Sequence, residues 1–217
     1  KENAVQDYEK AAILGPSDSA NFVVQGKGFT GINEYQSALL AFDEAIRLNP
    51  NSSDAYKYRG VLSAQIGDYP EAIADVNRAI EISPGDADAF FQRSQIFSEL
   101  GQISAAVTDL GNAIKRNPIN PDYLYNRGLL HYAAGAFTPA MKDFDSAIRL
   151  KQDSAQVDPR YAKQFVSRGK AHFDSKYLGL AENDVRDALR ILEYNFHSPA
   201  WDEYQHKIHS QLADAHE

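Results

Sequence analysis

Histidines are the residues of this chain that most readily suggest metal chemistry. His206 and His209 stand three residues apart on a predicted C-terminal helix, with His216 nearby. Two histidines at helical spacing can bind Zn²⁺, but neither a third ligand nor a carboxylate that would orient the imidazoles is evident. His131 and His172 share one position of a repeat that is described below, where a packing role is the simpler interpretation. We therefore predict no metal site.

Catalytic groups are equally sparse. The chain has no cysteine, which excludes thiol nucleophiles, thiolate metal sites and disulfides. It contains no phosphate loop, nucleophile elbow or dinucleotide-binding fingerprint. Carboxylate pairs such as Asp184 and Asp187 fall on polar helix faces and indicate solvated charge. We predict that the protein is not an enzyme and has neither catalytic residues nor a cofactor.

The composition is that of an ordinary folded protein. The 217 residues are 43% hydrophobic and 24% charged, and 22 Lys and Arg against 30 Asp and Glu give a formal net charge of −8. Nucleic-acid binding needs clustered Lys and Arg, so the acidic balance argues against a nucleic-acid partner. No apolar run is long enough to span a bilayer, so we expect no membrane insertion.

A repeat of 34 residues dominates the sequence. Small and bulky side chains recur at this interval through four copies, and an offset of 41, which is seven more, carries the pattern into a fifth. Apolar residues recur at helical spacing on both sides of a turn such as Gly67-Asp68, and a proline such as Pro84 ends the second helix. Each copy therefore reads as two helices. The small positions include Gly26, Gly60, Ser94, Gly128 and Gly169, then Ala38, Ala72, Ala106, Ala140 and Ala181, then Ala45, Ala79, Ala113, Ala147 and Ala188; the bulky position holds Phe42, Val76, Leu110, Phe144 and Val185.

This pattern resembles the tetratricopeptide repeat (TPR) family. The resemblance implies an all-α, right-handed α-solenoid that covers residues 1–217 as a single domain. Bulky residues at the small positions would overpack the helices, at a cost of about 1–3 kcal/mol. The full repeats are 19–52, 53–86, 87–120, 121–154 and 162–195; residues 1–18 match the second half of a truncated repeat, 155–161 form an insertion, and 198–217 form a capping helix with one polar face.

A charge pair recurs with the repeat. Four copies have an arginine just before the Gly or Ser position and an aspartate sixteen residues later, whereas the first copy lacks both. We predict that the two side chains meet between the two helices of one repeat. As exposed pairs they would contribute about 0.2–1 kcal/mol each and fix helix registry more than stability. The pairs are Arg59 with Asp75, Arg93 with Asp109, Arg127 with Asp143, and Arg168 with Asp184.

The resemblance also implies a binding surface, because the first helices of successive TPR repeats line a concave groove. Aromatic side chains in a helical stripe usually belong to the core. Here other residues fill the core positions, so exposure in a groove and burial both stay open. An aromatic groove with scattered polar groups suits an extended peptide or a partner helix. The predicted groove contacts are Lys27, Lys57, Phe91, Gln95, Tyr125, Leu129, Tyr132, Lys170 and Phe173.

One TPR subtype holds the acidic C-terminal tail of heat-shock chaperones in a carboxylate clamp of Lys, Asn and Arg side chains. Lys57 matches the first clamp lysine, but Val61 stands where the clamp has Asn. The following repeats offer Gln92, Asp122 and Asn126 in place of Asn, Lys and Arg. The sequence therefore departs from this clamp.

We predict a non-enzymatic scaffold that binds a peptide or helix of a partner protein in the TPR groove. Two alternatives stay open. The chain could self-assemble into a homo-oligomer through the apolar face of its open half repeat, or it could be the TPR portion of a larger enzyme or multidomain protein. Because the chain begins inside a repeat, its true N-terminus is expected to lie upstream. The compartment is therefore unknown, with the cytoplasm as the first hypothesis.

Overall fold

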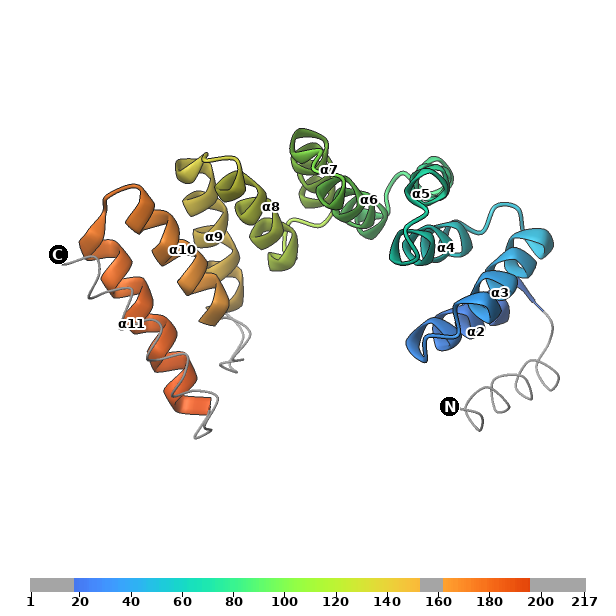
Figure 1. Cartoon of the computed structure of the whole chain (residues 1–217), viewed down its shortest axis with the longest axis horizontal. Helices are drawn as coiled ribbons and strands as arrows, with labels where there is room; N and C mark the ends of the chain where they lie inside the picture. Colours follow the sequence, from blue (N-terminus) through green and yellow to red (C-terminus); the bar gives the residue numbers. More distant parts are fainter. Residues whose placement is uncertain (1–17, 153–161, 196–217) are drawn as a thin grey trace. The chain divides into compact units, whose positions relative to one another are not determined.

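The structure is a computed structural model that describes residues 18–152 and 162–195. Every regular element in these residues is an α-helix, so the predicted all-α class is confirmed (Figure 1). The predicted insertion 155–161, the capping helix 198–217 and almost all of the half repeat 1–18 lie outside the described residues, as do His206, His209 and His216. The helices are α2 (Ser19–Gly31), α3 (Tyr35–Leu48), α4 (Ser53–Gln65), α5 (Tyr69–Ile82), α6 (Ala87–Glu99), α7 (Ile103–Arg116), α8 (Pro121–Ala133), α9 (Phe137–Gln152), α10 (Ala162–Asp174) and α11 (Leu178–Asn195).

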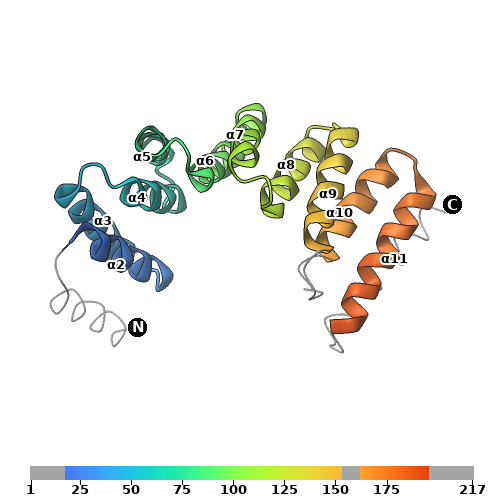
Figure 2. The ribbon, with the colours of Figure 1, turned by 180° about the vertical axis from the view of Figure 1, so that it is seen from behind.

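The helices fall into two compact units, α2–α7 and α8–α11. Within each unit, consecutive helices form pairs joined by short turns (Figures 1 and 2). The first helix of a pair also packs against both helices of the pair before it: α4 on α2 and α3, α6 on α4 and α5, and α10 on α8 and α9. The predicted architecture of stacked helix-turn-helix repeats is confirmed within each unit. A single domain over residues 1–217 stays a prediction, as do the limits of its repeats.

The first helices begin at similar capping residues. Asp18, Ser52, Asp86 and Asn120, each 34 residues apart, stand immediately before α2, α4, α6 and α8. Each side chain accepts a hydrogen bond from a backbone N–H of the first helical turn, for example from Asn21 N at 2.8 Å to Asp18. These bonds satisfy amides that a helix start leaves without partners. The repeat therefore includes its own start signal for the first helix.

The turn between the two helices of a pair requires a left-handed backbone residue. Asn33, Gly67, Gly101, Gly135 and Lys176 occupy this position and all have φ between 62° and 87°. The following amide then bonds back to the first helix, as Asp68 N does to Ser63 O at 2.8 Å. Glycine adopts this conformation without steric cost, whereas for a residue with a Cβ the same conformation is strained. Lys176 keeps the same turn in the last described pair despite this cost.

The predicted small and bulky positions form the core. Ala38, Ala72, Ala106 and Ala140 are fully buried, and so are Ala45, Ala79, Ala113 and Ala147. The bulky position holds Phe42, Val76, Leu110 and Phe144, none more than 1% exposed. A Cβ on Gly26 would lie 2.4 Å from Phe42 Cε1, and a Cβ on Gly128 would lie 2.6 Å from Phe144 Cε1. Glycine thus brings the two helices of these pairs together at a distance that no larger residue permits.

The predicted Arg–Asp pairs all form between the two helices of one repeat. Arg93 donates from Nε and Nη2 to the two oxygens of Asp109 at 2.7 Å each, and Arg59 and Arg127 make the same two-oxygen contact with Asp75 and Asp143. Arg168 donates from Nε and Nη2 to a single oxygen of Asp184, Oδ1. The expectation of exposed pairs is wrong, because the four aspartates are at most 6% exposed. The hydrogen bonds that Arg59 and Arg127 donate to Asp75 and Asp143 raise the pKa of both guanidinium groups.

Three of these arginines also reach the preceding pair of helices. Arg59 on α4 donates to Asp43 on α3 at 2.6 Å, and Arg93 on α6 donates to Asn77 on α5 at 2.6 Å. Arg168 on α10 likewise pairs with Asp145 on α9. One guanidinium therefore joins three helices within a unit, a role that the sequence analysis did not predict. The signal was present, since Asp43 and Asn77 stand sixteen residues before their arginines.

Candidate protein-binding site

The first helices carry the nine predicted groove residues, four in one unit and five in the other. Lys27 lies on α2, Lys57 on α4, and Phe91 and Gln95 on α6. The second unit carries Tyr125, Leu129 and Tyr132 on α8 and Lys170 and Phe173 on α10. Because α2, α4 and α6 contact one another in sequence order, as α8 and α10 do, each unit presents a face made of first helices. Their side chains differ widely in exposure.

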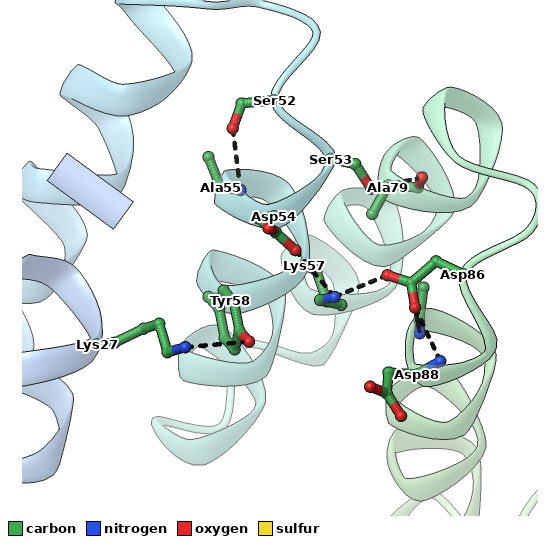
Figure 3. Close-up of polar contacts among 11 residues, drawn as sticks. Lys27, Ser52, Ser53, Asp54, Ala55, Lys57, Tyr58, Ala79, Asp86 and Asp88 are labelled. Carbon is green, nitrogen blue, oxygen red and sulfur yellow. Dashed lines mark hydrogen bonds and ion pairs between the residues drawn. The ribbon is translucent and has the colours of Figure 1, made fainter. Parts of the chain in front are cut away.

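Lys57 is held inside the first unit. Its ammonium donates to Asp86 Oδ2 at 2.7 Å and pairs with Asp54 Oδ1 at 3.0 Å, and the residue is 7% exposed (Figure 3). Burial by itself lowers the pKa of an ammonium, but the two carboxylates outweigh it and raise the pKa of Lys57 above its ordinary value. Asp86 also caps α6. Lys57 therefore joins α4 to the start of α6, and the charge is already matched within the chain.

Lys27 is exposed and lies against an aromatic ring. Its ammonium is 4.4 Å from the ring centroid of Tyr58 and donates to the Tyr58 hydroxyl at 3.3 Å, which links α2 to α4 (Figure 3). Among the described residues no carboxylate pairs with this ammonium. A cation over an aromatic face gains about 0.5–1 kcal/mol at an exposed site. Lys27 therefore stays available to an acidic group of a partner.

The remaining predicted residues of the first unit lie on α6. Phe91 is partly buried, whereas Gln95 one turn later is exposed. The backbone carbonyl of Phe91 accepts a hydrogen bond from the hydroxyl of Ser94, the serine that replaces glycine in this repeat, at 2.6 Å. The small position is therefore kept here by a buried polar side chain that bonds to its own helix. Of the two predicted residues on α6, Gln95 is therefore the one that is accessible to a partner.

Tyr125 belongs largely to the core of the second unit. It is 9% exposed, its ring centroid lies 5.8 Å from that of Phe144, and its hydroxyl is 3.4 Å from Ser167 Oγ on α10. Leu129 on the same helix is partly buried. Of the two interpretations left open for the aromatic stripe, burial therefore describes Tyr125.

The other end of α8 presents a mixed polar and aromatic cluster with α10. Tyr132 donates its hydroxyl to Asp174 Oδ2, and the Lys170 ammonium lies 5.6 Å from the ring centroid of Tyr132. Burial, together with the hydrogen bond and negative charge of Asp174, raises the pKa of Tyr132 to about 12. Lys170 is exposed, and Phe173 one turn later is 42% exposed. We call Leu129, Tyr132, Lys170 and Phe173 the α8–α10 patch.

The histidines at the shared repeat position pack beside the Arg–Asp pairs. His172 Nδ1 lies 2.6 Å from Asp184 Oδ2, and His131 Nε2 lies 3.8 Å from Asp143 Oδ2. In the part of the chain that the structure describes, no group of three metal-ligating side chains comes together. No helix among the described residues has the length and hydropathy that a bilayer crossing requires.

Sequence reasoning missed two groups on these faces. Tyr58 follows the predicted Lys57 directly, but it stands at a position that holds Val24 or Gln92 in neighbouring repeats, so no aromatic pattern marks it. The role of Asp86 as a partner of Lys57 was also missed. Its sequence signal is its place in the series of capping residues, which puts it where the next first helix begins.

The comparisons with known proteins decide the family. A family model described as tetratricopeptide repeat matches residues 25–87 and 91–155. The chain belongs to the TPR family. The matched residues span the Gly, Ala and bulky positions that form the core of the pairs from α2–α3 to α8–α9. No curated protein matches the chain.

Solved TPR structures share this fold at low sequence identity. MamA is 20% identical, with a TM-score of 0.69 over 78% of this chain and 95% of that one. YrrB, described as a TPR protein with an unusual peptide-binding site, is 20% identical, with a TM-score of 0.65 over 88% of this chain and 95% of that one. BtubC (BKLC) from P. vanneervenii is 17% identical, with a TM-score of 0.74 over 91% of each chain. At these identities the likeness concerns the fold alone.

Proposed function

We propose that this TPR protein is a non-enzymatic scaffold that binds a peptide or helix of a partner protein on the faces formed by its first helices. TPR modules in general serve protein–protein interaction, and the related structure of YrrB is described as having a peptide-binding site. A fold alone does not fix a function, so this chain's own side chains must support the proposal.

The observation that carries the proposal is that some cationic side chains are paired within the chain whereas others stay exposed without an ion pair among the described residues. The four arginines that recur with the repeat are engaged by aspartates between helices, and Lys57 is engaged by Asp54 and Asp86. Lys27 and Lys170, in contrast, stand at the same repeat position of α2 and α10, are exposed, and make no ion pair with any described residue. Charged and aromatic groups left accessible on first helices suit a polypeptide ligand.

Site-specific cross-linking tests this proposal. The photoreactive amino acid p-benzoylphenylalanine is placed at position 95 on α6 or position 173 on α10, both of which are exposed on first helices. Matched controls carry it at position 108 on α7 or position 142 on α9, which are exposed on second helices. After irradiation in cell extract, we expect a discrete protein adduct from positions 95 or 173 and at least fivefold less from the controls.

Two outcomes would contradict the proposal. Adducts that form only from positions 108 and 142 would move the interaction to the second helices. An adduct at twice the mass of the chain, with no other protein, would show self-assembly in place of partner binding.

A further inference from the structure

The α8–α10 patch has a chemistry that selects among polypeptide ligands, and the inference drawn from it rests on the proposed function. Leu129 and Lys170 hold one repeat position on α8 and α10, and Tyr132 and Phe173 hold another. Two adjacent helices thus contribute three apolar or aromatic side chains and one ammonium. We propose that this patch binds an internal peptide segment in which an acidic side chain stands next to a large apolar one.

Large apolar side chains are exposed beside Lys170. The eight residues 173–180, from the end of α10 to the start of α11, carry four large side chains that water reaches. Phe173 is 42% exposed, Tyr177 56%, Leu178 47% and Leu180 51%. Exposed apolar side chains that gather in one place mark interaction sites more often than single ones do. Phe173 adjoins Lys170 by one helical turn, so an apolar ligand group on Phe173 brings its neighbours to the ammonium.

The Lys170 ammonium favours an acidic side chain in the ligand. Among the described residues no carboxylate pairs with its ammonium, which lies on the Tyr132 ring. A neutral ligand that covered this ammonium would remove its water of hydration and offer no polar group in exchange, which costs free energy. A carboxylate on the ligand would replace that water with an ion pair. Asp174 already accepts the Tyr132 hydroxyl, and this bond holds the ring beneath Lys170.

The placement of the acidic residue separates this site from the carboxylate clamp. The clamp lysine position is filled by Lys57, which is buried and paired within the first unit. Lys170 stands four positions later in its own repeat, on α10 of the second unit. In this proposal an acidic side chain of the ligand pairs with Lys170, so the α8–α10 patch does not require a free C-terminal carboxylate. A peptide with an amidated C-terminus should therefore bind as tightly as the same peptide with a free one.

A set of fluorescein-labelled, C-terminally amidated twelve-residue peptides tests the inference by anisotropy. Each peptide has Asp or Glu one to four residues from a Leu or Phe in a Ser/Gly background, and a matched set has Lys in place of the acid. We expect the tightest acidic peptide to bind about tenfold more tightly than its Lys version, since the swap exchanges an attraction for a repulsion. Phe173→Ala should weaken that peptide about tenfold.

A charge reversal gives the sharper result. Lys170→Glu should make the chain prefer the Lys peptides, whereas Lys142→Glu, on the exposed part of α9, should leave the preference unchanged. Far-ultraviolet circular dichroism checks that each variant keeps its helices. Equal binding of acidic and Lys peptides, binding of neither set, or a preference that Lys170→Glu does not alter would overturn the inference. The proposed function would survive those results if cross-linking from position 95 still captured a partner protein.

Discussion

The Arg93–Asp109 pair offers a quantitative test of how the repeats are held together. The perturbation is Arg93→Met, which keeps an unbranched side chain but removes the guanidinium. Asp109 is 3% exposed and accepts two hydrogen bonds of 2.7 Å from Arg93. The substitution therefore leaves a buried carboxylate without the partner that the structure gives it.

The expected loss follows from two limits. Breaking a buried pair by removing one partner costs about 3–5 kcal/mol. Protonating an aspartic acid of ordinary pKa costs about 4 kcal/mol at pH 7 and about 1.5 kcal/mol at pH 5, and the variant can take this route. We therefore expect Arg93→Met to lower the free energy of unfolding by about 3–4 kcal/mol at pH 7. The loss should shrink to about 1–2 kcal/mol at pH 5, because a neutral carboxyl is buried more easily than a charged one.

Urea unfolding followed by circular dichroism at 222 nm measures these losses at both pH values. A double variant, Arg93→Met with Asp109→Leu, is the matched control, because it buries apolar groups where the ion pair stood. It should lie within about 1 kcal/mol of the wild-type chain. A loss below 1 kcal/mol for Arg93→Met at pH 7, or one that does not change with pH, would show that the pair behaves as an exposed one.

Three further predictions concern single positions. Gly128→Ala should destabilise the chain by about 1–3 kcal/mol, because its Cβ would meet Phe144; an unchanged urea midpoint would contradict this close approach. Lys176→Gly should stabilise it by about 1 kcal/mol by relieving a left-handed residue that carries a Cβ, and a lower melting temperature would refute that reading of the turn. Tyr132 should ionise with a midpoint near 12, seen as the difference between the 295 nm absorbance titrations of the wild-type chain and Tyr132→Phe. Asp174→Asn should bring this midpoint closer to 10, because it removes the negative charge that disfavours the phenolate. The raised pKa of Tyr132 stabilises the fold below pH 10, and this contribution is lost as the pH rises toward 12.

Much of the fold could be predicted because one pattern repeats five times. Ala72 and Ala79 are uninformative alone, yet their equivalents recur at 34 residues in positions that the structure buries completely. The Arg–Asp pairs were predicted for the same reason. The burial of these pairs was not predicted, because the exposure of Asp75 or Asp109 depends on how the neighbouring helices pack, which the sequence spacing does not reveal. The division into two compact units was not predicted either.

The candidate site was less predictable, because the exposure of a side chain depends on residues of neighbouring helices. Lys57 and Tyr125 share a position on the first helix, and each is buried for a different reason. Lys57 is buried because the capping Asp86 of the next helix reaches it, and Tyr125 because Phe144 lies beside its ring. Lys170 stays exposed, although its position in repeat four holds the partly buried Leu129. The sequence identifies the face, and only the structure separates its accessible residues from its structural ones.

Amide hydrogen exchange of the chain, with and without the partner that cross-linking captures, tests the central claim most directly. If first helices form the binding faces, exchange should slow by at least tenfold in the contacted members of α2, α4, α6, α8 and α10. The facing second helices of the same pairs should change far less. Protection confined to second helices such as α7 or α9, or no protection at all, would contradict the account.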